Sequence, residues 1–493
     1  MARTPLPLPV SLDPTNPLPL HAQLREALRV AILDRRWPRG ARLPASRVLA
    51  ADLACARGTV VLALEQLVAE GYLTARPGSA TRVAATLPDD LAPSTGQSEG
   101  ASSAPMPKLS RRGASLTATP RLRYMAGSAA PDAFALGRPA PDAFPYAIWA
   151  RLLQAEWRQG PVEPPDPRGS PALRNAIALY LTQARGVACA AEDVIVTAGI
   201  RQSLRLLAEL LLDPGETALV EEPGFPGIAQ ALASAGLRTV PIPIGPGGLA
   251  ASRAALLAPG ARLAVVTPAH HYPLGHTMSL ENRLDLLAWA ESVGGWVVED
   301  DYDGAYRYAG RPLAPLRALD RAGRVIYVGS FSKLLLPALG LSYLVLPRGL
   351  VAPVNQALAE IGPAPSGIGQ WALARFIEDG HLAGHLRRTR RLYALRQEAL
   401  LEAAANLAGD VIAVGPMEGG MHLIARPGPA WPRDCTDAAA ASTLGQAGIS
   451  AVALSAYHAG VPQPGLLLGY AAVPERAIAP AVRRMAETLR QIP

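Results

Sequence analysis

The 493-residue sequence predicts a multi-domain protein: a small α+β unit, a linker, and a larger α/β domain with a mostly parallel sheet. Three observations support this organisation. Residues 1–85 contain three helical repeats of apolar residues and then two short β segments around a turn. Residues 86–125 have no apolar period. From residue 126 to 493, helices alternate with short apolar runs, as in a sheet that is covered on both faces, and a smaller C-terminal α+β subdomain follows.

Composition narrows the class of protein. The net charge of +7 permits an anionic partner without proving one. Three cysteines (Cys55, Cys189 and Cys435) lie far apart, which argues against a disulfide framework or a zinc site and suits a reducing compartment. No apolar stretch approaches the ~18 residues that span a bilayer, and the N-terminus lacks an apolar signal segment. We therefore expect a soluble, cytoplasmic protein with no membrane partner.

The N-terminal unit is built from three predicted helices and a hairpin. Apolar residues from Leu20 to Ile32 recur at helical spacing, which predicts a helix over 18–35. A second helix starts near Ser46, a possible N-cap, and a third runs from Arg57 to Ala69 and ends at Gly71. The flanking segments 72–76 and 81–83 predict two strands around the turn Pro77–Gly78.

This order of elements is that of a winged helix-turn-helix, which binds double-stranded DNA. The start of the third helix, Arg57 to Thr59, would enter the major groove. Phosphate contacts are expected from the second helix and the hairpin, at Arg47, Arg76, Ser79 and Arg82. The alternative is an ordinary helical unit with a solvated basic face, and the order of elements favours DNA binding.

The linker and the large domain follow. Residues 86–125 are rich in Ser, Pro, Ala and Gly, typical of a flexible linker, and their basic end is best interpreted as a solvated charge run. Long helices are expected from about 366 to 407. The predicted strands are Val194–Thr197, Ala218–Glu221, Leu263–Thr267, Trp296–Glu299, Val325–Gly329 and Leu341–Leu346.

Lys333 is the most informative single residue. The chain has two lysines, Lys108 and Lys333, and 45 arginines. A guanidinium stays protonated, whereas a lysine amine can lose its proton and attack an aldehyde. Lys333 follows a predicted strand directly and stands among small hydroxyl residues. These surroundings favour covalent chemistry over a leftover surface residue, which is our interpretation of Lys108.

Other chemical groups follow the ends of neighbouring strands, where open α/β sheets bind ligands. The turn 197–202 leads through Gly199 into a helix and suits a phosphate, although a plain turn would look the same. Phe225 could stack on a flat ligand, although such a residue is more often core. In the acidic run 299–303, a buried carboxylate can bind a protonated pyridine nitrogen and Tyr302 can bond a ring oxygen. A metal site is the alternative for this run, but no matching histidines lie nearby in sequence.

Together with Lys333, this set fits a pyridine aldehyde phosphate. The sequence here resembles known families. Residues 43–73 are similar to the GntR-type winged helix, and residues from about 130 to 475 to fold-type I, pyridoxal 5'-phosphate (PLP)-dependent aminotransferases. The whole chain resembles MocR/GabR-type transcriptional regulators. The motifs that carry the aminotransferase resemblance are Asp166–Gly169, Thr267–Gly275, Glu299–Asp303 and Ser330–Lys333.

The resemblance implies residue roles. Lys333 would form the Schiff base, Asp300 would pair with the pyridine nitrogen, and Tyr302 would contact the ring hydroxyl. Phe225 would stack on the ring, and Ser330 with Gly199, Ile200 and Arg201 would hold the phosphate. His271 stands where the family often has Gln and, with Tyr272, would lie near the ring oxygen. DNA contacts are implied for Arg47, Arg57, Thr59 and Gly78.

The sequence departs from the family at several of these places. The phosphate-binding Arg seven residues after the lysine is Gly340, a loss of roughly a few kcal/mol. Arg201 replaces a more usual Gln, and we hypothesise that it supplies the missing charge. No Arg near Leu466–Tyr470 can clamp an α-carboxylate, which weighs against efficient transamination. In the recognition helix, Ala56 and Gly58 stand where Ser and Asn are common.

Three functions remain open from the sequence. The first is a transcriptional regulator that senses PLP or an amine effector. The second is an active PLP-dependent aminotransferase with an appended DNA-binding head, and the third is a regulator whose pocket no longer binds PLP. The winged helix favours a regulator over a plain enzyme. Because fold-type I sites lie at a dimer interface, the resemblance also implies a homodimer and an operator with repeated half-sites.

Overall fold

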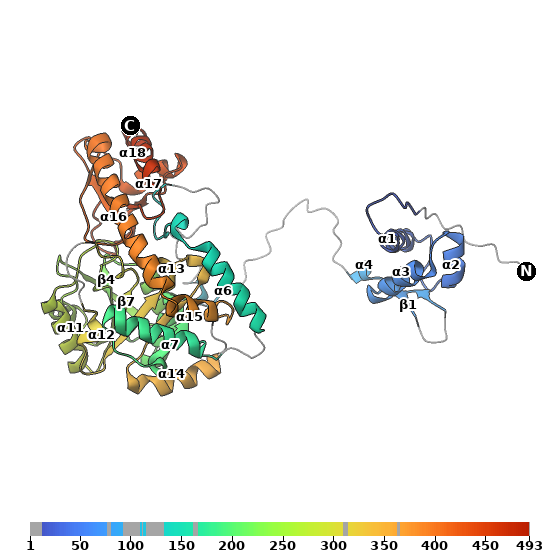
Figure 1. Ribbon diagram of the computed structural model, residues 1–493, viewed down its shortest axis with the longest axis horizontal. Helices are drawn as coiled ribbons and strands as arrows, with labels where there is room; N and C mark the ends of the chain where they lie inside the picture. Colours follow the sequence, from blue (N-terminus) through green and yellow to red (C-terminus); the bar gives the residue numbers. More distant parts are fainter. Residues whose placement is uncertain are drawn as a thin grey trace, which may run out of the picture. The chain divides into compact units, whose positions relative to one another are not determined.

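The computed structural model describes residues 12–75, 80–91, 109–110, 112–114, 133–160, 166–308, 314–361 and 365–492. Contacts divide the chain into two compact units, Met1–Lys108 and Leu109–Pro493 (Figure 1). Among the residues in these ranges, no helix is both long enough and apolar enough to cross a membrane.

The N-terminal unit has the predicted winged helix-turn-helix fold. Its helices are α1 (Leu20–Leu33), α2 (Ser46–Asp52) and α3 (Arg57–Ala69), and its strands β1 (Leu73–Thr74) and β2 (Arg82–Val83) pair antiparallel. Apolar faces of the three helices meet in one core with Leu24, Leu49 and Leu67, all fully buried. Amphipathic spacing and this shared core explain why the three short helices pack together.

Two details of this unit differ from the sequence-based expectation. Ser46 is the first residue of α2 and Ala45 is its N-cap, so the Ser46 side chain does not cap the helix. Its hydroxyl instead accepts a 3.4 Å hydrogen bond from Arg57 Nε. Residues 86–91, expected in the linker, pack on this unit: Leu87 is buried, and the first residues of α4 (Pro88–Leu91) include Asp89, which accepts a bond from the Tyr72 hydroxyl.

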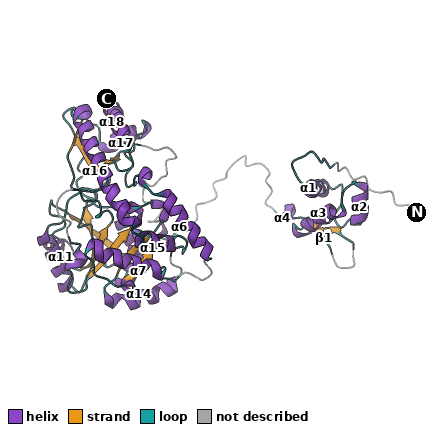
Figure 2. Ribbon diagram, viewed as in Figure 1, coloured by secondary structure: helices purple, strands orange, loops and turns teal. Residues whose placement is uncertain are grey.

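The C-terminal unit is built around a seven-stranded sheet in the order β3-β9-β8-β7-β6-β4-β5. All pairs from β8 to β5 are parallel, and β9 is antiparallel to both of its neighbours. The strands lie at the centre of the unit, with helices outside them (Figure 2). Their bounds are β3 Val194–Thr197, β4 Thr217–Glu222, β5 Arg238–Pro243, β6 Ala261–Val266, β7 Trp296–Asp301, β8 Val325–Ser330 and β9 Ser342–Val345.

Six of these strands match the predicted segments to within two residues at each end. The sequence analysis missed β5 because it contains Pro241 and Pro243, which cannot donate to a ladder. The prolines are tolerated because β5 lies at the edge of the sheet, where β4 is its only pairing partner among the described strands.

Helices cover both faces of this sheet. One apolar cluster joins one face to α8 (Ile200–Leu211), α9 (Pro226–Ser234) and α14 (Arg348–Ile361). Two further clusters cover the opposite face. The helices that contribute to them include α6 (Tyr146–Gln159), α7 (Pro171–Tyr180), α10 (Ala251–Leu257), α11 (Leu280–Ser292), α12 (Leu316–Leu319) and α15 (Gln370–Glu378). Short helical turns lie at Pro141–Ala143, Leu181–Arg185, Ala191–Asp193 and Pro337–Leu339.

The smaller subdomain contains a second sheet, antiparallel, in the order β10-β11-β13-β12. The predicted long helical region is two helices, α15 and the 28-residue α16 (His381–Ala408). The remaining elements are β10 Ile412–Val414, β11 His422–Pro427, α17 Asp437–Gln446, β12 Val452–Ala453, the turn Leu454–Tyr457, β13 Leu466–Gly469 and α18 Glu475–Arg490.

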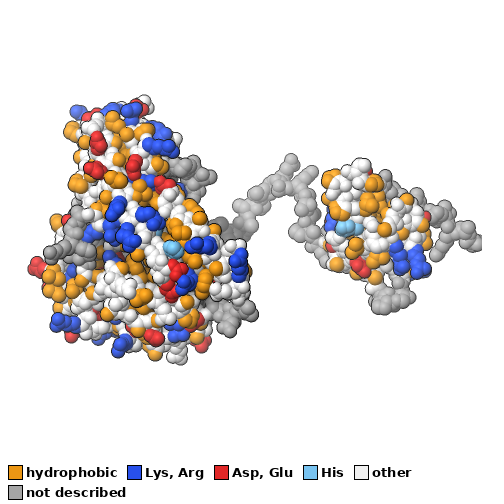
Figure 3. Space-filling model, in the orientation of Figure 1, with side chains coloured by type: hydrophobic (Ala, Val, Ile, Leu, Met, Phe, Trp, Pro, Cys, Tyr) orange, Lys and Arg blue, Asp and Glu red, His pale blue; other side chains and the backbone are white. Residues whose placement is uncertain are grey.

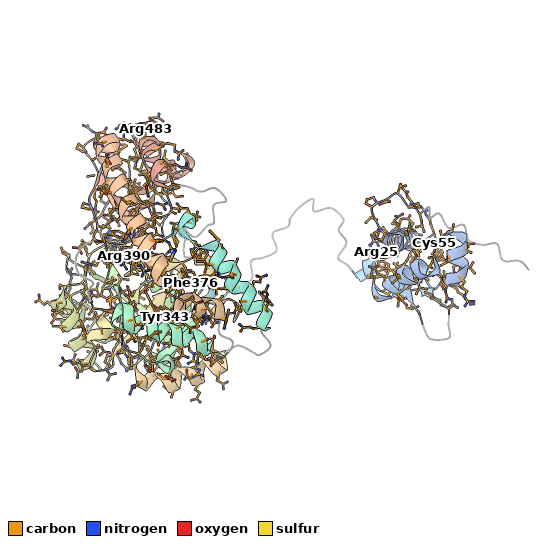
Figure 4. The ribbon with its side chains drawn as sticks, viewed as in Figure 1. Arg25, Cys55, Tyr343, Phe376, Arg390 and Arg483 are labelled. Atoms are coloured by element: carbon orange, nitrogen blue, oxygen red, sulfur yellow. The ribbon has the colours of Figure 1, made fainter. Side chains whose placement is uncertain are left out.

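Helix α16 is hydrogen-bonded to the backbone of the large domain at two places, the loop after β7 and the short helix α13 (Phe331–Leu334). Arg390, labelled in Figure 4, donates from Nε and Nη2 to the Ala305 carbonyl oxygen at 3.1 and 2.8 Å. One turn earlier on α16, His385 Nε2 lies 3.1 Å from the Leu334 carbonyl oxygen. Both acceptors are close in sequence to predicted site residues, since Ala305 lies three residues after Tyr302 and Leu334 directly follows Lys333.

Candidate functional site

A cavity of about 340 Å³ lies at the carboxyl ends of β3, β7 and β8. The strands are parallel here, so residues that follow them in sequence meet at one edge of the sheet. The structure brings nine predicted residues to its wall: Gly199, Ile200, Arg201, Phe225, Tyr272, Asp300, Tyr302, Ser330 and Lys333.

Lys333 is presented by the short helix α13 (Phe331–Leu334) directly after β8. Its Nζ donates a 2.9 Å hydrogen bond to the Gly137 carbonyl oxygen. Burial lowers the pKa of the Lys333 amine, against the opposing effects of Asp303 and Asp300. A lowered pKa increases the neutral fraction of an amine, which is its nucleophilic form.

Asp300 lies near the end of β7 and is 7% exposed. Burial raises the pKa of its carboxyl to about 8, and the neighbouring carboxylates Asp301, Asp303 and Glu221 raise it further in the same direction. A positive charge placed beside a buried carboxyl favours the ionised form of the carboxyl and lowers its pKa. The Asp300 position therefore suits a protonated ring nitrogen.

Tyr302 is held by a histidine and a second acid. Its hydroxyl lies 3.0 Å from His270 Nδ1, and the same Nδ1 lies 3.1 Å from Asp303 Oδ2. The rings of Tyr272 and Tyr302 meet edge to face with centroids 5.8 Å apart, and Phe225 meets Tyr272 in the same way at 5.9 Å. The aromatic side of the cavity is thus fixed by contacts among its own residues.

His271 is not brought to the cavity. It is buried behind the wall, with Nε2 3.7 Å from Glu221 Oε2, and burial lowers its pKa to about 3. The histidine beside Tyr302 is its neighbour, His270. The backbone of this loop turns the two adjacent side chains in different directions, which the sequence pattern did not reveal.

The part of the cavity where a phosphate is expected is formed by a helix N-terminus and two serines. Gly199 is the N-cap of α8 with φ +132°, a conformation that favours glycine, and residues 198–202 line the wall. Ser330 Oγ accepts a 3.1 Å hydrogen bond from Ser342 Oγ. Backbone N–H groups and the helix dipole make such an end a site for anions. Arg201 is among the residues that line this part of the cavity, and its role as the replacement phosphate charge stays a prediction.

Five lining residues were not predicted as site residues from the sequence: Leu136, Gly137, Ser342, Met421 and His422. His422 begins β11 of the smaller subdomain, and its Nε2 lies 2.9 Å from the Pro273 carbonyl oxygen. Burial lowers the pKa of His422 to about 4, so the ring is neutral at neutral pH. No local sequence pattern identifies these residues as part of the cavity, because the segments that carry them are far apart in the chain.

The donor set fits pyridoxal phosphate. An amine, a buried carboxyl, aromatic rings, and a helix N-terminus with serine hydroxyls match the aldehyde, ring nitrogen, ring face and phosphate of that molecule. Across the part of the chain that the structure describes, no group of three or more His, Cys, Asp or Glu side chains is placed to hold a metal ion.

The described residues that are predicted to contact DNA lie at the start of α3 and on α2. Arg47 and Arg57 are exposed, and Thr59 is half-buried. Blue side chains gather on one side of this unit in Figure 3. Arg82 Nη1 donates to the Gly40 carbonyl oxygen at 2.9 Å. The predicted contacts Arg76, Gly78 and Ser79 lie outside the described residues.

Fold and site together define an aminotransferase-like domain joined to a winged helix. Comparison with protein families agrees. Residues 20–83 match the family "Bacterial regulatory proteins, gntR family", and residues 147–485 match "Aminotransferase class I and II". The chain belongs to the aminotransferase class I and II family by its large domain, and as a whole to the MocR-type transcriptional regulators with a GntR domain.

Individual relatives support the same assignment. The chain is 40% identical over 469 residues to the "Probable rhizopine catabolism regulatory protein MocR" of Rhizobium meliloti, covering 94% of this chain and 92% of that protein. It is 31% identical to the "HTH-type pyridoxine biosynthesis transcriptional regulator PdxR" of Corynebacterium glutamicum, over 94% of each chain.

A solved structure shows the fold of the large domain. The Pyrococcus horikoshii kynurenine aminotransferase, solved with PMP, has a TM-score of 0.64 and 26% identity, covering 73% of this chain and 90% of that one. The protein is therefore a DNA-binding transcriptional regulator with an aminotransferase-like domain, and pyridoxal phosphate is the cofactor of that domain.

Proposed function

We propose that the cofactor cavity is the sensing site of this regulator and that Lys333 is the residue that reads PLP or an amine effector. The observation that supports the proposal most directly is the pairing of a Lys333 amine of lowered pKa with the buried Asp300 carboxyl in one cavity. When bound, pyridoxal phosphate supplies an aldehyde carbon that a primary amine can attack.

Each wall of the cavity has its own task in this proposal. Asp300 holds the protonated ring nitrogen, and Phe225 packs on the ring. Tyr302 donates to the ring oxygen from a position fixed by the His270 contact. The N-terminus of α8, Ser330 and Arg201 hold the phosphate. An incoming amine competes with Lys333, and the regulator responds if its DNA-binding arrangements differ in affinity for the two states.

The apolar character of β13 favours sensing over enzymatic turnover. Leu466, Leu467 and Leu468 are fully buried and offer no charge to a substrate carboxylate. Among the described residues that line the cavity, the cationic side chains are Arg201 and Lys333. An aminotransferase with a DNA-binding head remains the second candidate, supported by the fold itself. A regulator whose pocket no longer binds PLP is the third candidate. It is supported by Gly340, which stands where the family usually has a phosphate-binding Arg.

We also propose that the regulator is a cytoplasmic homodimer that binds an operator with two half-sites. The fold supports this, since winged helices that work in pairs read repeated sites. Arg47, Arg57 and Thr59, with the hairpin residues Arg76, Gly78 and Ser79, would make the DNA contacts. Size-exclusion chromatography with light scattering tests the dimer, and footprinting tests the spacing of half-sites.

Visible absorption of the purified protein tests the sensing site. We expect a yellow, borohydride-reducible band in wild type that Lys333→Ala abolishes. The matched control is Lys108→Ala, which removes the other lysine and should leave the band unchanged. An unaltered band in Lys333→Ala would overturn the role of Lys333. Incubation with amino donors then separates sensing from turnover, since an aminotransferase releases keto acid over many cycles.

The link to DNA requires a second measurement. Footprints of the operator with and without PLP, and with candidate amines, should change in extent or affinity for wild type. Lys333→Ala should give one footprint under all of these conditions. A wild-type footprint that is indifferent to every ligand would contradict sensing while leaving DNA binding intact.

A further inference from the structure

A second cavity, of about 300 Å³, lies beside the cofactor cavity. Its wall is formed by the end of β4, the start of α9 and the loop that follows the turn Leu454–Tyr457. The two cavities share Phe225 and Thr267. Most of the remaining wall is apolar, with Val220, Ile228 and Pro241 among its residues.

The polar end of this second cavity is formed by Glu222 and His458. Glu222 Oε1 accepts hydrogen bonds from Ala459 N at 2.7 Å and Gly460 N at 3.0 Å. It also lies 3.6 Å from His458 Nδ1. The His458 side chain is only 5% exposed, and its Nε2 has no hydrogen-bond partner within the described part of the chain. A buried ring nitrogen without a hydrogen-bond partner destabilises the folded protein. It therefore indicates a ligand that forms a hydrogen bond with this nitrogen.

Charge defines the ligand further. None of the described residues that line this cavity is Lys or Arg, whereas Glu222 lines it together with Glu221, a carboxyl whose pKa burial raises to about 7. Burial lowers the pKa of His458, with a smaller effect of Arg426 in the same direction and an opposing effect of Glu222, which favours the neutral ring. In the neutral tautomer that carries its proton on Nδ1, the nitrogen nearer Glu222, Nε2 is an acceptor. The matching ligand has a positive charge, an N–H to donate and an apolar body.

The second cavity is connected to the cofactor cavity by hydrogen bonds. The hydroxyl of Tyr457, which lines the second cavity, lies 2.9 Å from the hydroxyl of Tyr272, which lines the first. Thr267 donates from its N and Oγ1 to Glu221 Oε2 at 3.0 and 2.6 Å. A ligand that moves Tyr457 or Glu221 therefore alters groups that face the cofactor.

We infer that this second cavity binds a small protonated amine with an apolar body, through His458 Nε2 and Glu222. The amine donates its N–H to His458 Nε2, places its charge beside Glu222, and packs its carbon chain on Ile228 and Pro241. Its role as an effector, transmitted through Tyr457 and Tyr272, rests on the proposed function. The binding itself is noncovalent and does not involve Lys333.

A tertiary amine separates this site from the covalent one. N,N-dimethylbutylamine is protonated at neutral pH, has one N–H to donate and cannot condense with an aldehyde. Calorimetric titration of the full-length, PLP-loaded protein should show saturable binding. His458→Leu should weaken it about tenfold or more, the effect of losing a hydrogen bond to a charged group. Glu222→Gln should also weaken it, while its amide oxygen can still accept from the loop.

The controls keep the test specific. Val461→Ala changes a residue that is 89% exposed on the same loop, and it should leave the titration unchanged. Pentan-1-ol, an uncharged ligand of similar size, should bind more weakly than the amine. The visible band of the cofactor should be the same in wild type and His458→Leu.

Equal amine affinity in wild type and His458→Leu would overturn this inference, as would the absence of saturable binding in a protein with a normal cofactor band. Failure of the proposed function is distinguishable, because it would appear as a missing band or as DNA binding indifferent to every ligand. The amine titration does not depend on either readout.

Discussion

Lys333 Nζ is hydrogen-bonded at 2.9 Å to the carbonyl oxygen of Gly137, a residue 196 positions earlier in the chain. Gly137 has φ +65°, and a Cβ atom built on it would lie 2.2 Å from Nζ. The amine of the site is therefore positioned against a backbone that only glycine allows so close. This contact couples the segment before the first helix of the large domain to the reactive residue.

Gly137→Ala should weaken PLP binding by about tenfold or more, because the new methyl group displaces the Lys333 amine from its place. Titration of the visible absorption band with PLP measures the affinity. The matched control is Gly186→Ala, which has a similar φ of +67° and nothing within 4 Å of the added Cβ. Both variants carry the backbone strain of about 1 kcal/mol, so equal affinities would contradict a specific contact at residue 137.

Asp300→Asn should make the stability of the cofactor-free protein less dependent on pH. The folded-state pKa of about 8 lies above the value in the unfolded chain, so the protonated carboxyl contributes stability below pH ~4. That contribution is lost as the pH rises towards 8, at a cost of the order of a few kcal/mol. Thermal unfolding from pH 5 to 8 should show a falling Tm in wild type and a flatter curve in Asp300→Asn.

The control for this experiment is Asp285→Asn, which changes an exposed acid on α11. Its pH profile should follow that of wild type. Adding PLP should raise the Tm of wild type more than that of Asp300→Asn, since a positive charge beside Asp300 stabilises its ionised form. Parallel profiles for wild type and Asp300→Asn would contradict the assignment.

Arg201→Gln should raise the Kd for PLP about tenfold, since a charge-assisted hydrogen bond to a phosphate is among the stronger contacts of a site. Arg205→Gln removes an arginine one turn further along α8, where it is paired with Glu209 at 2.9 Å, and should have little effect on PLP affinity. Full PLP affinity in Arg201→Gln would show that Arg201 does not replace the phosphate-binding charge that is missing at Gly340.

Arg57→Ala should weaken binding to the operator by about 1–3 kcal/mol, as for an arginine that contacts a base edge. Fluorescence anisotropy on a duplex selected by the wild-type protein measures the change. Arg36→Ala serves as the control, because Arg36 is exposed just after α1 and is paired with Asp34 at 3.3 Å. An equal loss in both variants would indicate that Arg57 contributes only general positive charge.

Features that are local in sequence could be predicted. The helices of the N-terminal unit and six strands of the large sheet follow from the spacing of apolar residues. Most residues that line the cavity could be predicted because they follow the ends of these strands. This worked because parallel strands bring their carboxyl ends together. Lys333 and Asp300 could be placed in one site for that reason alone.

Features that depend on distant contacts could not be predicted. Gly137 and His422 reach the cavity from segments far from Lys333 in sequence, and no periodicity connects them. His270 and His271 are adjacent and chemically identical, so only the backbone of their loop decides which one contacts Tyr302. The strand β5 was hidden by its prolines, whose tolerance at an edge depends on the finished sheet.

Helix α16 is hydrogen-bonded directly to backbone segments beside the cofactor cavity. Through Arg390 it is bonded to Ala305, two residues beyond Asp303, and through His385 to Leu334, next to Lys333. A displacement of α16 would therefore strain backbone hydrogen bonds that lie close in sequence to both Tyr302 and Lys333.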